Sequence, residues 1–134
     1  MLAIVDTGPL FAWADRSDRD HDACLEVLRR SDLSLVIPGL VVAEAAFLIA
    51  SRLGPGAEAA FFRALVAMDV EDSRPDFARI AELVETYRDF PLGGVDASVV
   101  ATAERLGAES VVTLDRRRLL AVRPRHCEAF RVLP

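Results

Sequence analysis

The sequence predicts a three-layer α/β/α fold around a mainly parallel central sheet. Short apolar runs alternate along the chain with longer segments of helical composition, and this alternation is typical of βαβ units. The short runs are apolar at consecutive positions, as in strands that helices cover on both faces. The length of 134 residues suits a single domain over residues 1–134, and 52% hydrophobic against 28% charged residues is the balance of a folded globular chain.

The first half of the chain contains two predicted strands and three predicted helices. These elements are a strand at Leu2–Val5, a helix beginning at residues 10–14, a helix around residues 24–28, a strand at residues 33–37 and a helix at Gly39–Leu53. Each strand is a continuous apolar run, and a turn over residues 6–9 leads the first strand into its helix. Pro38 ends the second strand because proline cannot donate to a ladder. A Gly-Pro-Gly sequence at residues 54–56 ends the last of these helices.

The second half continues the same alternation. Its predicted elements are a helix at residues 57–68, a short strand ending at Val70, an amphipathic helix at residues 76–87, a helix at residues 95–106 and strands at residues 110–114 and 130–133. Proline and glycine within residues 91–94 break the chain before the third helix, and Gly107 ends that helix. The pattern contains neither an internal repeat nor a linker, so we expect one domain.

The charged residues are unusual because all 16 basic residues are arginines and the chain has no lysine. This excludes chemistry that requires lysine, such as Schiff-base catalysis. The net charge of -5 argues against a general electrostatic coat for nucleic acid. The charge is unevenly distributed, however, because residues 116–134 carry six arginines against the single acid Glu128.

The cysteine content and the hydropathy of the chain indicate in which cellular compartment the protein is expected. Cys24 and Cys127 are too few for a disulfide framework and are expected to be reduced, and neither pairs with His21 or His126 at the spacing of a zinc site. The apolar N-terminal run is too short for a signal peptide, and no later run approaches the roughly 20 residues of a membrane span. We therefore expect a cytoplasmic protein without a membrane segment.

Four carboxylates stand at element ends or in apolar surroundings. Asp6 and Asp115 each follow a predicted strand, and parallel central strands would bring both to one edge of the sheet, where ligands bind. Glu44 lies in a helix expected to be buried nearly all round, where an unpaired carboxylate is costly, and Asp96 opens another helix. Each acid also has a structural explanation. Asp6 and Asp115 suit helix caps, Asp96 suits a helix dipole, and Glu44 can face outward or pair with Arg52.

Convergence of the four acids at one strand edge would create a cluster that stays ionised only with cations. An all-oxygen site suits Mg²⁺ or Mn²⁺, hard ions that keep several waters and bind substrate phosphates. Thr7 and Thr113 flank two of the acids and are candidate hydrogen-bond partners of a ligating carboxylate. Threonine equally suits a strand or a helix start, so this role stays open.

Four short motifs, each containing one of these acids, and a closing segment occur in order along the chain. They are Ile4-Val5-Asp6-Thr7, Val41-Val42-Ala43-Glu44, Gly94-Val95-Asp96-Ala97, Thr113-Leu114-Asp115-Arg116-Arg117 and Phe130-Arg131-Val132-Leu133-Pro134. In this order and spacing they resemble the PIN-domain ribonucleases, specifically the VapC toxins of VapBC toxin–antitoxin pairs, over essentially the whole chain. The resemblance implies a PIN-like fold and a metal-dependent endoribonuclease. Family members typically cleave structured RNAs of translation, form homodimers and are inhibited by a small cognate VapB-type antitoxin.

The acidic quartet of that family corresponds to Asp6, Glu44, Asp96 and Asp115. On this hypothesis Asp6 and Asp96 bind the principal Mg²⁺ directly, and Asp115 and Glu44 complete the site through oxygens or bound water. Either Glu44 or Asp115 orients the attacking water or accepts its proton. The resemblance implies products with a 5′-phosphate and a 3′-hydroxyl, so the RNA 2′-hydroxyl is not the nucleophile.

The arginines that follow the last acid are candidates for binding the RNA backbone, with Arg116 and Arg117 nearest to the acidic positions. A solvated face or a surface for the antitoxin explains them equally well. Two other function classes remain as alternatives. A non-catalytic PIN-like binding module is disfavoured by the complete quartet, and a phosphoacceptor receiver-type domain by the missing lysine and by Thr7 directly after Asp6.

Overall fold

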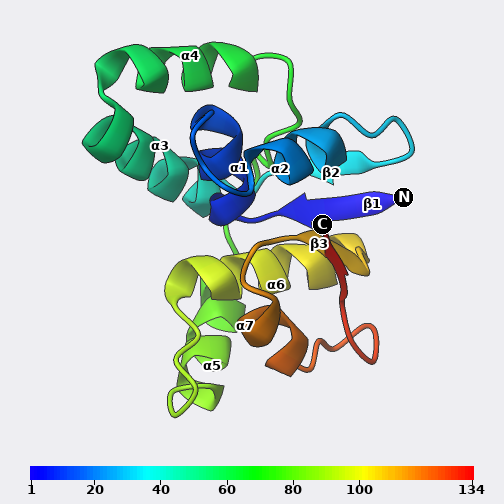
Figure 1. Cartoon of the computed structure of the whole chain (residues 1–134). Coiled ribbons are helices and arrows are strands. Elements are labelled where there is room, and N and C mark those ends of the chain that lie inside the picture. Colours follow the sequence, from blue (N-terminus) through cyan, green and yellow to red (C-terminus); the bar gives the residue numbers. More distant parts are fainter.

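The computed structural model describes residues 1–134 and contains a parallel sheet flanked by helices (Figure 1). The strands are β1 (Leu2–Val5), β2 (Ser34–Val36), β3 (Ser110–Val112) and β4 (Arg131–Leu133). The helices are α1 (Thr7–Ala14), α2 (His21–Leu28), α3 (Gly39–Leu53), α4 (Pro55–Leu65), α5 (Phe77–Thr86), α6 (Gly94–Leu106) and α7 (Arg116–Ala121). The predicted α/β fold with a parallel sheet is confirmed.

The sheet has the strand order β2-β1-β3-β4, so β1 is an interior strand. The chain leaves β1 toward β2 on one side and returns to β3 on the other, which reverses the strand order at β1. The backbone N–H of Asp6 donates to the carbonyl of Val112 at 2.9 Å, which holds the carboxyl ends of β1 and β3 together. In open parallel sheets, the crevice that binds ligands lies at such a reversal point.

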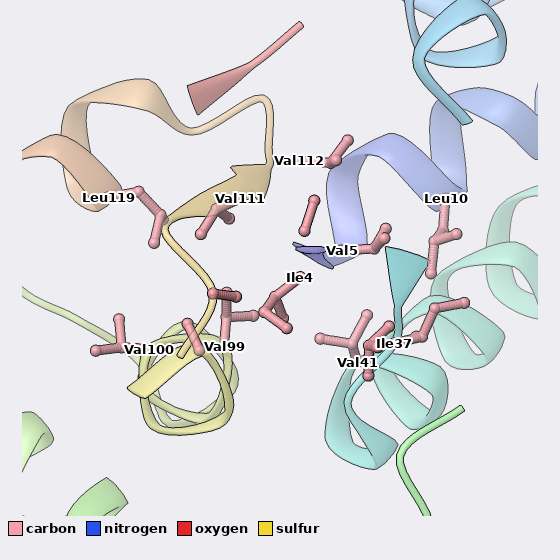
Figure 2. Packing of buried hydrophobic residues seen from close by; sticks show 14 of the residues in the cluster. Ile4, Val5, Leu10, Ile37, Val41, Val99, Val100, Val111, Val112 and Leu119 are labelled. Atoms are coloured by element: carbon pink, nitrogen blue, oxygen red, sulfur yellow. The ribbon is translucent and has the colours of Figure 1, made fainter. Parts of the chain in front are cut away.

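The hydrophobic core is a cluster of 27 buried residues centred on the sheet. In Figure 2, Leu10 of α1 lies on one side of the strand residues Ile4 and Val111. Val41 of α3 and Val99 of α6 lie on the other side. Apolar helix faces therefore cover both faces of the central strands, which is why these strands are apolar at consecutive positions.

Two features differ from the predicted elements. The strand predicted to end at Val70 is wrong, because Val70 forms only an isolated parallel bridge with Ile37 before the chain turns away. Helix α7 was not among the predicted elements, yet it follows β3 directly and contacts β4. The other helices and strands lie within a few residues of their predicted positions, and no helix is both long and apolar enough to cross a membrane.

Candidate active site

Five carboxylates line one cleft of about 470 Å³ at the carboxyl edge of the sheet. Four of them are the predicted acids, which come from four different segments, and the fifth is Asp18 in the loop before α2, which was not among the predicted site residues. Asp6 follows β1 and caps α1, and Asp115 follows β3 and caps α7. Asp96 lies in the first turn of α6, and Glu44 lies in the second turn of α3. The structure therefore brings all four predicted acids to one cleft, and the capping explanations for Asp6 and Asp115 also hold.

Asp6 is the most buried of the four acids, with 6% of its surface exposed. Its Oδ1 accepts the backbone N–H of Thr7 at 2.8 Å, and its Oδ2 accepts the hydroxyl of Thr113 at 2.7 Å. Burial is the largest cause that raises the pKa of Asp6 to about 6. The two hydrogen bonds oppose this rise, and the charges of Asp96 and Glu44 add to it. A cation in the cleft would relieve this penalty on the ionised carboxylate.

Asp96 and Asp115 face the same arginine. Oδ2 of Asp96 accepts the backbone N–H of Gly93 at 3.3 Å and lies 3.4 Å from Nη1 of Arg118. Burial raises the pKa of Asp96, and the positive charge of Arg118 acts in the opposite direction. Asp115 Oδ2 lies 3.4 Å from Nε of Arg118, and the backbone N–H of Asp115 donates to the Thr113 hydroxyl at 3.0 Å. Thr113 thus links Asp115 to Asp6.

Glu44 reaches the cleft from an exposed position. The prediction that its helix is buried nearly all round is wrong, because Ala43, Glu44 and Phe47 face outward and Phe47 is 70% exposed. The sequence did not distinguish the exposed face of this helix from its buried face, since alanine is compatible with either. The predicted alternative of an ion pair with Arg52 is not formed either. Arg52 instead lies over the ring of Phe11, 5.3 Å from its centroid.

The two predicted threonines have different surroundings. The hydroxyl of Thr113 contacts Asp6, whereas the hydroxyl of Thr7 is buried without any hydrogen-bond partner. Thr7 supports Asp6 through its backbone N–H alone. Its hydroxyl is buried in the protein and has no partner within it.

Neither of the two predicted RNA-binding arginines forms an ion pair with the four acids, although Arg117 lines a neighbouring hollow together with Asp115 and Arg118. Nη1 of Arg116 donates to the carbonyl of Pro134 at 2.9 Å, and the guanidinium of Arg117 lies 5.3 Å from the Phe90 ring centroid. The arginines that line the cleft are Arg52 and Arg118. The sequence offers a clue for Arg118, because a residue three positions after Asp115 lies on the same face once residues 116–121 are helical. No comparable pattern identifies Arg52.

The donor set of the cleft fits a hard divalent cation. Carboxylate oxygens are the ligands that Mg²⁺ and Mn²⁺ prefer, and five carboxylates line this cleft. As the side chains are placed, no group of three histidine, cysteine or acidic residues forms an ion site by itself. Mg²⁺ usually binds through one or two carboxylates and keeps several waters, so it does not require a cage made wholly of protein ligands.

Fold and site together define the class of this protein. It is an α/β protein with a parallel sheet and an acidic cleft at the point where the strand order reverses. The model of the PIN domain family matches residues 3–123, and the chain belongs to that family. The receiver-type alternative is therefore excluded.

Similar proteins agree with this assignment. Ribonuclease VapC26 from Mycobacterium tuberculosis is 37% identical over 134 residues, covering 98% of this chain and 99% of the relative. Among solved structures, VapC20 from Mycobacterium tuberculosis, described as a Sarcin-Ricin loop cleaving toxin, superposes with a TM-score of 0.75 at 19% identity over 83% of this chain and 87% of that one. VapBC2 from Rickettsia felis, bound to a promoter DNA fragment, gives a TM-score of 0.68 at 15% identity over the full length of both chains. At these identities the two structures support the fold alone.

Proposed function

We propose that this PIN-domain protein is an endoribonuclease that depends on Mg²⁺, with Mn²⁺ as a possible substitute, and acts as the toxin of a toxin–antitoxin pair. The observation that carries this proposal is the convergence of Asp6, Glu44, Asp96 and Asp115 on one cleft at the reversal point of the sheet. The name of the 37% identical relative, a ribonuclease, supports the same activity.

The acids would divide the work of hydrolysis. Asp6 and Asp96 would hold the cation, with Glu44 and Asp115 completing the set. A divalent cation held by these residues would lower the pKa of a bound water and would offset charge on the phosphate oxygens during in-line attack. Thr113 keeps the carboxylate of Asp6 in one orientation, so that little reorganisation is needed when the ion binds.

Glu44 is the better placed of the two candidate proton acceptors. Both carboxylate oxygens of Asp115 face Arg118, whose backbone N–H lies 3.1 Å from Oδ1 and whose Nε lies 3.4 Å from Oδ2. Glu44 has neither an ion pair nor a hydrogen bond through its side chain. The water oxygen bonds to phosphorus and its proton passes to Glu44. The bond from phosphorus to the 3′ oxygen breaks, and that oxygen takes a proton from a solvent water to give a 3′-hydroxyl and a 5′-phosphate. Glu44 then returns its own proton to the solvent.

A structured RNA of translation is the proposed substrate, by analogy with VapC20 as a Sarcin-Ricin loop cleaving toxin. The proposed partners are a VapB-type antitoxin, as in the VapBC2 assembly from Rickettsia felis, and a second copy of this chain in a homodimer. The cytoplasm is the proposed compartment, since it holds both the RNA and the antitoxin.

Replacing Asp6 or Asp96 by asparagine tests the function. Each variant keeps the shape of the side chain but loses the charge that holds the cation, so we expect RNA cleavage to fall at least about 100-fold. RNA ends mapped in cells expressing wild type or Asp6→Asn measure the loss, and excess chelator should reproduce it with the purified protein.

Asp76→Asn is the matched control. Asp76 caps α5 by accepting the backbone N–H of Arg79 at 3.1 Å, much as Asp115 caps α7, but it lies outside the acidic cleft. It should retain cleavage. Full activity in the Asp6 and Asp96 variants, or in excess chelator, would rule out the mechanism, provided that thermal melts show folded protein.

A further inference from the structure

Arg118 contacts two of the acids that line the cleft. Its Nη1 lies 3.4 Å from Oδ2 of Asp96, and its Nε lies 3.4 Å from Oδ2 of Asp115. Its backbone N–H donates to Oδ1 of Asp115 at 3.1 Å, which fixes the main chain of the residue at the start of α7. The guanidinium therefore bridges carboxylates from two elements. The backbone of Arg118 is held in place, whereas its guanidinium is carried on a flexible chain of methylene groups.

These two contacts are loose compared with the structural ion pairs of the protein. Arg79 holds Glu104 with two hydrogen bonds of 2.7 and 2.9 Å, and the two side chains are 13% and 10% exposed. Arg118 makes one contact of 3.4 Å with each acid and is 44% exposed. Charge-assisted hydrogen bonds are strong near 2.7–2.9 Å, and exposed pairs contribute little. Arg118 can thus leave its partners at low cost.

The other arginines near the cleft are engaged elsewhere. Arg52 also lines the cleft but lies over the ring of Phe11, and it makes no ion pair with any of the four acids. Arg116 and Arg117 contact the carbonyl of Pro134 and the ring of Phe90. Arg118 is therefore the one cation of the chain within 4 Å of the acidic cluster.

We propose that Arg118 is an exchangeable counter-ion of the acidic cluster. Its guanidinium and a divalent cation compete for Oδ2 of Asp96 and Oδ2 of Asp115, so the ion displaces the guanidinium when it binds. The released guanidinium then binds an RNA phosphate in the same cleft, so its contacts with the two carboxylates are replaced by a contact with the substrate. This inference rests on the proposed function, because it requires the cleft to bind both a divalent cation and RNA.

Ion affinity tests the competition directly. Calorimetric titration of the full-length protein with Mn²⁺ compares wild type with Arg118→Ala, and with Arg116→Ala as a control that removes the same charge from the same helix. We expect Arg118→Ala to bind Mn²⁺ about two- to tenfold more tightly than wild type, since two weak pairs no longer compete. Arg116→Ala should stay within about twofold of wild type.

RNA affinity tests the second half of the proposal. With Ca²⁺ in place of Mg²⁺ to slow cleavage, fluorescence anisotropy should show Arg118→Ala binding RNA several-fold more weakly. Its salt dependence should be smaller by about one phosphate contact. Equal or weaker Mn²⁺ binding by Arg118→Ala would overturn the exchange, and unchanged RNA binding would overturn the transfer to phosphate. If wild type binds no Mn²⁺, the ion dependence in the proposed function fails as well, which distinguishes the two failures.

Discussion

Asp6 combines a structural role with a chemical one. It caps α1, yet its burial and the nearby charges of Asp96 and Glu44 raise its pKa to about 6. A helix cap does not require neighbouring acids, because a single carboxylate in solvent already accepts hydrogen bonds from the first N–H groups of a helix. The energetic cost of keeping Asp6 ionised beside two other acids is the kind of local conflict that is expected at functional sites.

Thr113→Val tests the support of Asp6. The substitution removes the hydroxyl that donates to Asp6, so we expect cleavage at pH 7 to fall about 10- to 100-fold. The rising limb of the pH–rate profile should move to higher pH, because this hydrogen bond lowers the pKa of Asp6 and an ionised Asp6 is needed to hold the cation. Thr102→Val is the control, since its hydroxyl donates to Ser98 within α6. An unchanged profile would contradict this role of Thr113.

The raised pKa of Asp6 also predicts a pH-dependent stability. The folded protein binds this proton more tightly than the unfolded chain, in which the pKa is near 3.8. The stability that Asp6 contributes is therefore fully present below pH 3.8 and is lost as the pH rises through about 6. Without divalent cations, Asp6→Asn should gain at most about 3 kcal/mol over wild type at pH 7. This gain should shrink toward pH 4 in urea unfolding, and an equal difference at both pH values would contradict the shift.

At the scale of elements, α7 shows where local sequence is insufficient. Its six residues include three arginines in the first turn, where the helix dipole favours acids instead. Asp115 compensates by accepting the backbone N–H of Arg118, and Leu119 anchors the helix with its fully buried side chain. A helix this short depends on such packing, because isolated helices of this length are not stable in water.

Adjacent leucines in α7 provide a matched pair for testing this anchor. Leu119→Ala should lower the free energy of unfolding by about 2–5 kcal/mol, because it opens a cavity in the core. Leu120 is 48% exposed, so Leu120→Ala should cost less than about 1 kcal/mol. Urea unfolding of both variants measures the difference. Equal losses would show that α7 does not depend on the burial of Leu119.

At the scale of the whole molecule, the strand order assembles the site. Reversal of the order at β1 brings the ends of β1 and β3 together, and the starts of α3 and α6 supply the other two acids. The arginines of the C-terminal segment have different partners within the protein. Arg116 contacts Pro134, and Arg117 lies over the ring of Phe90. Arg125 pairs with Glu82, and Arg131 contacts Met1. The net charge of this segment is thus a poor guide to where RNA binds.

The sequence alone predicted the parallel sheet, most of the helices and the placement of the four acids at one edge of the sheet. Apolar runs at consecutive positions require cover on both faces, and acids directly after two such runs must lie at the carboxyl edge of a parallel sheet. These conclusions depend on local patterns and on general rules of topology. The strand predicted to end at Val70 does not form, because one apolar residue before a polar turn cannot sustain a ladder with Ile37.

Only the tertiary structure decided the surroundings of each acid. Glu44 faces the cleft from an exposed helix surface, the hydroxyl of Thr7 has no partner, and Arg118 rather than Arg116 or Arg117 meets the acids. Each of these facts depends on helix rotation and on contacts between segments far apart in the chain. Sequence spacing records which residues share a local face, whereas packing against the sheet determines where that face points.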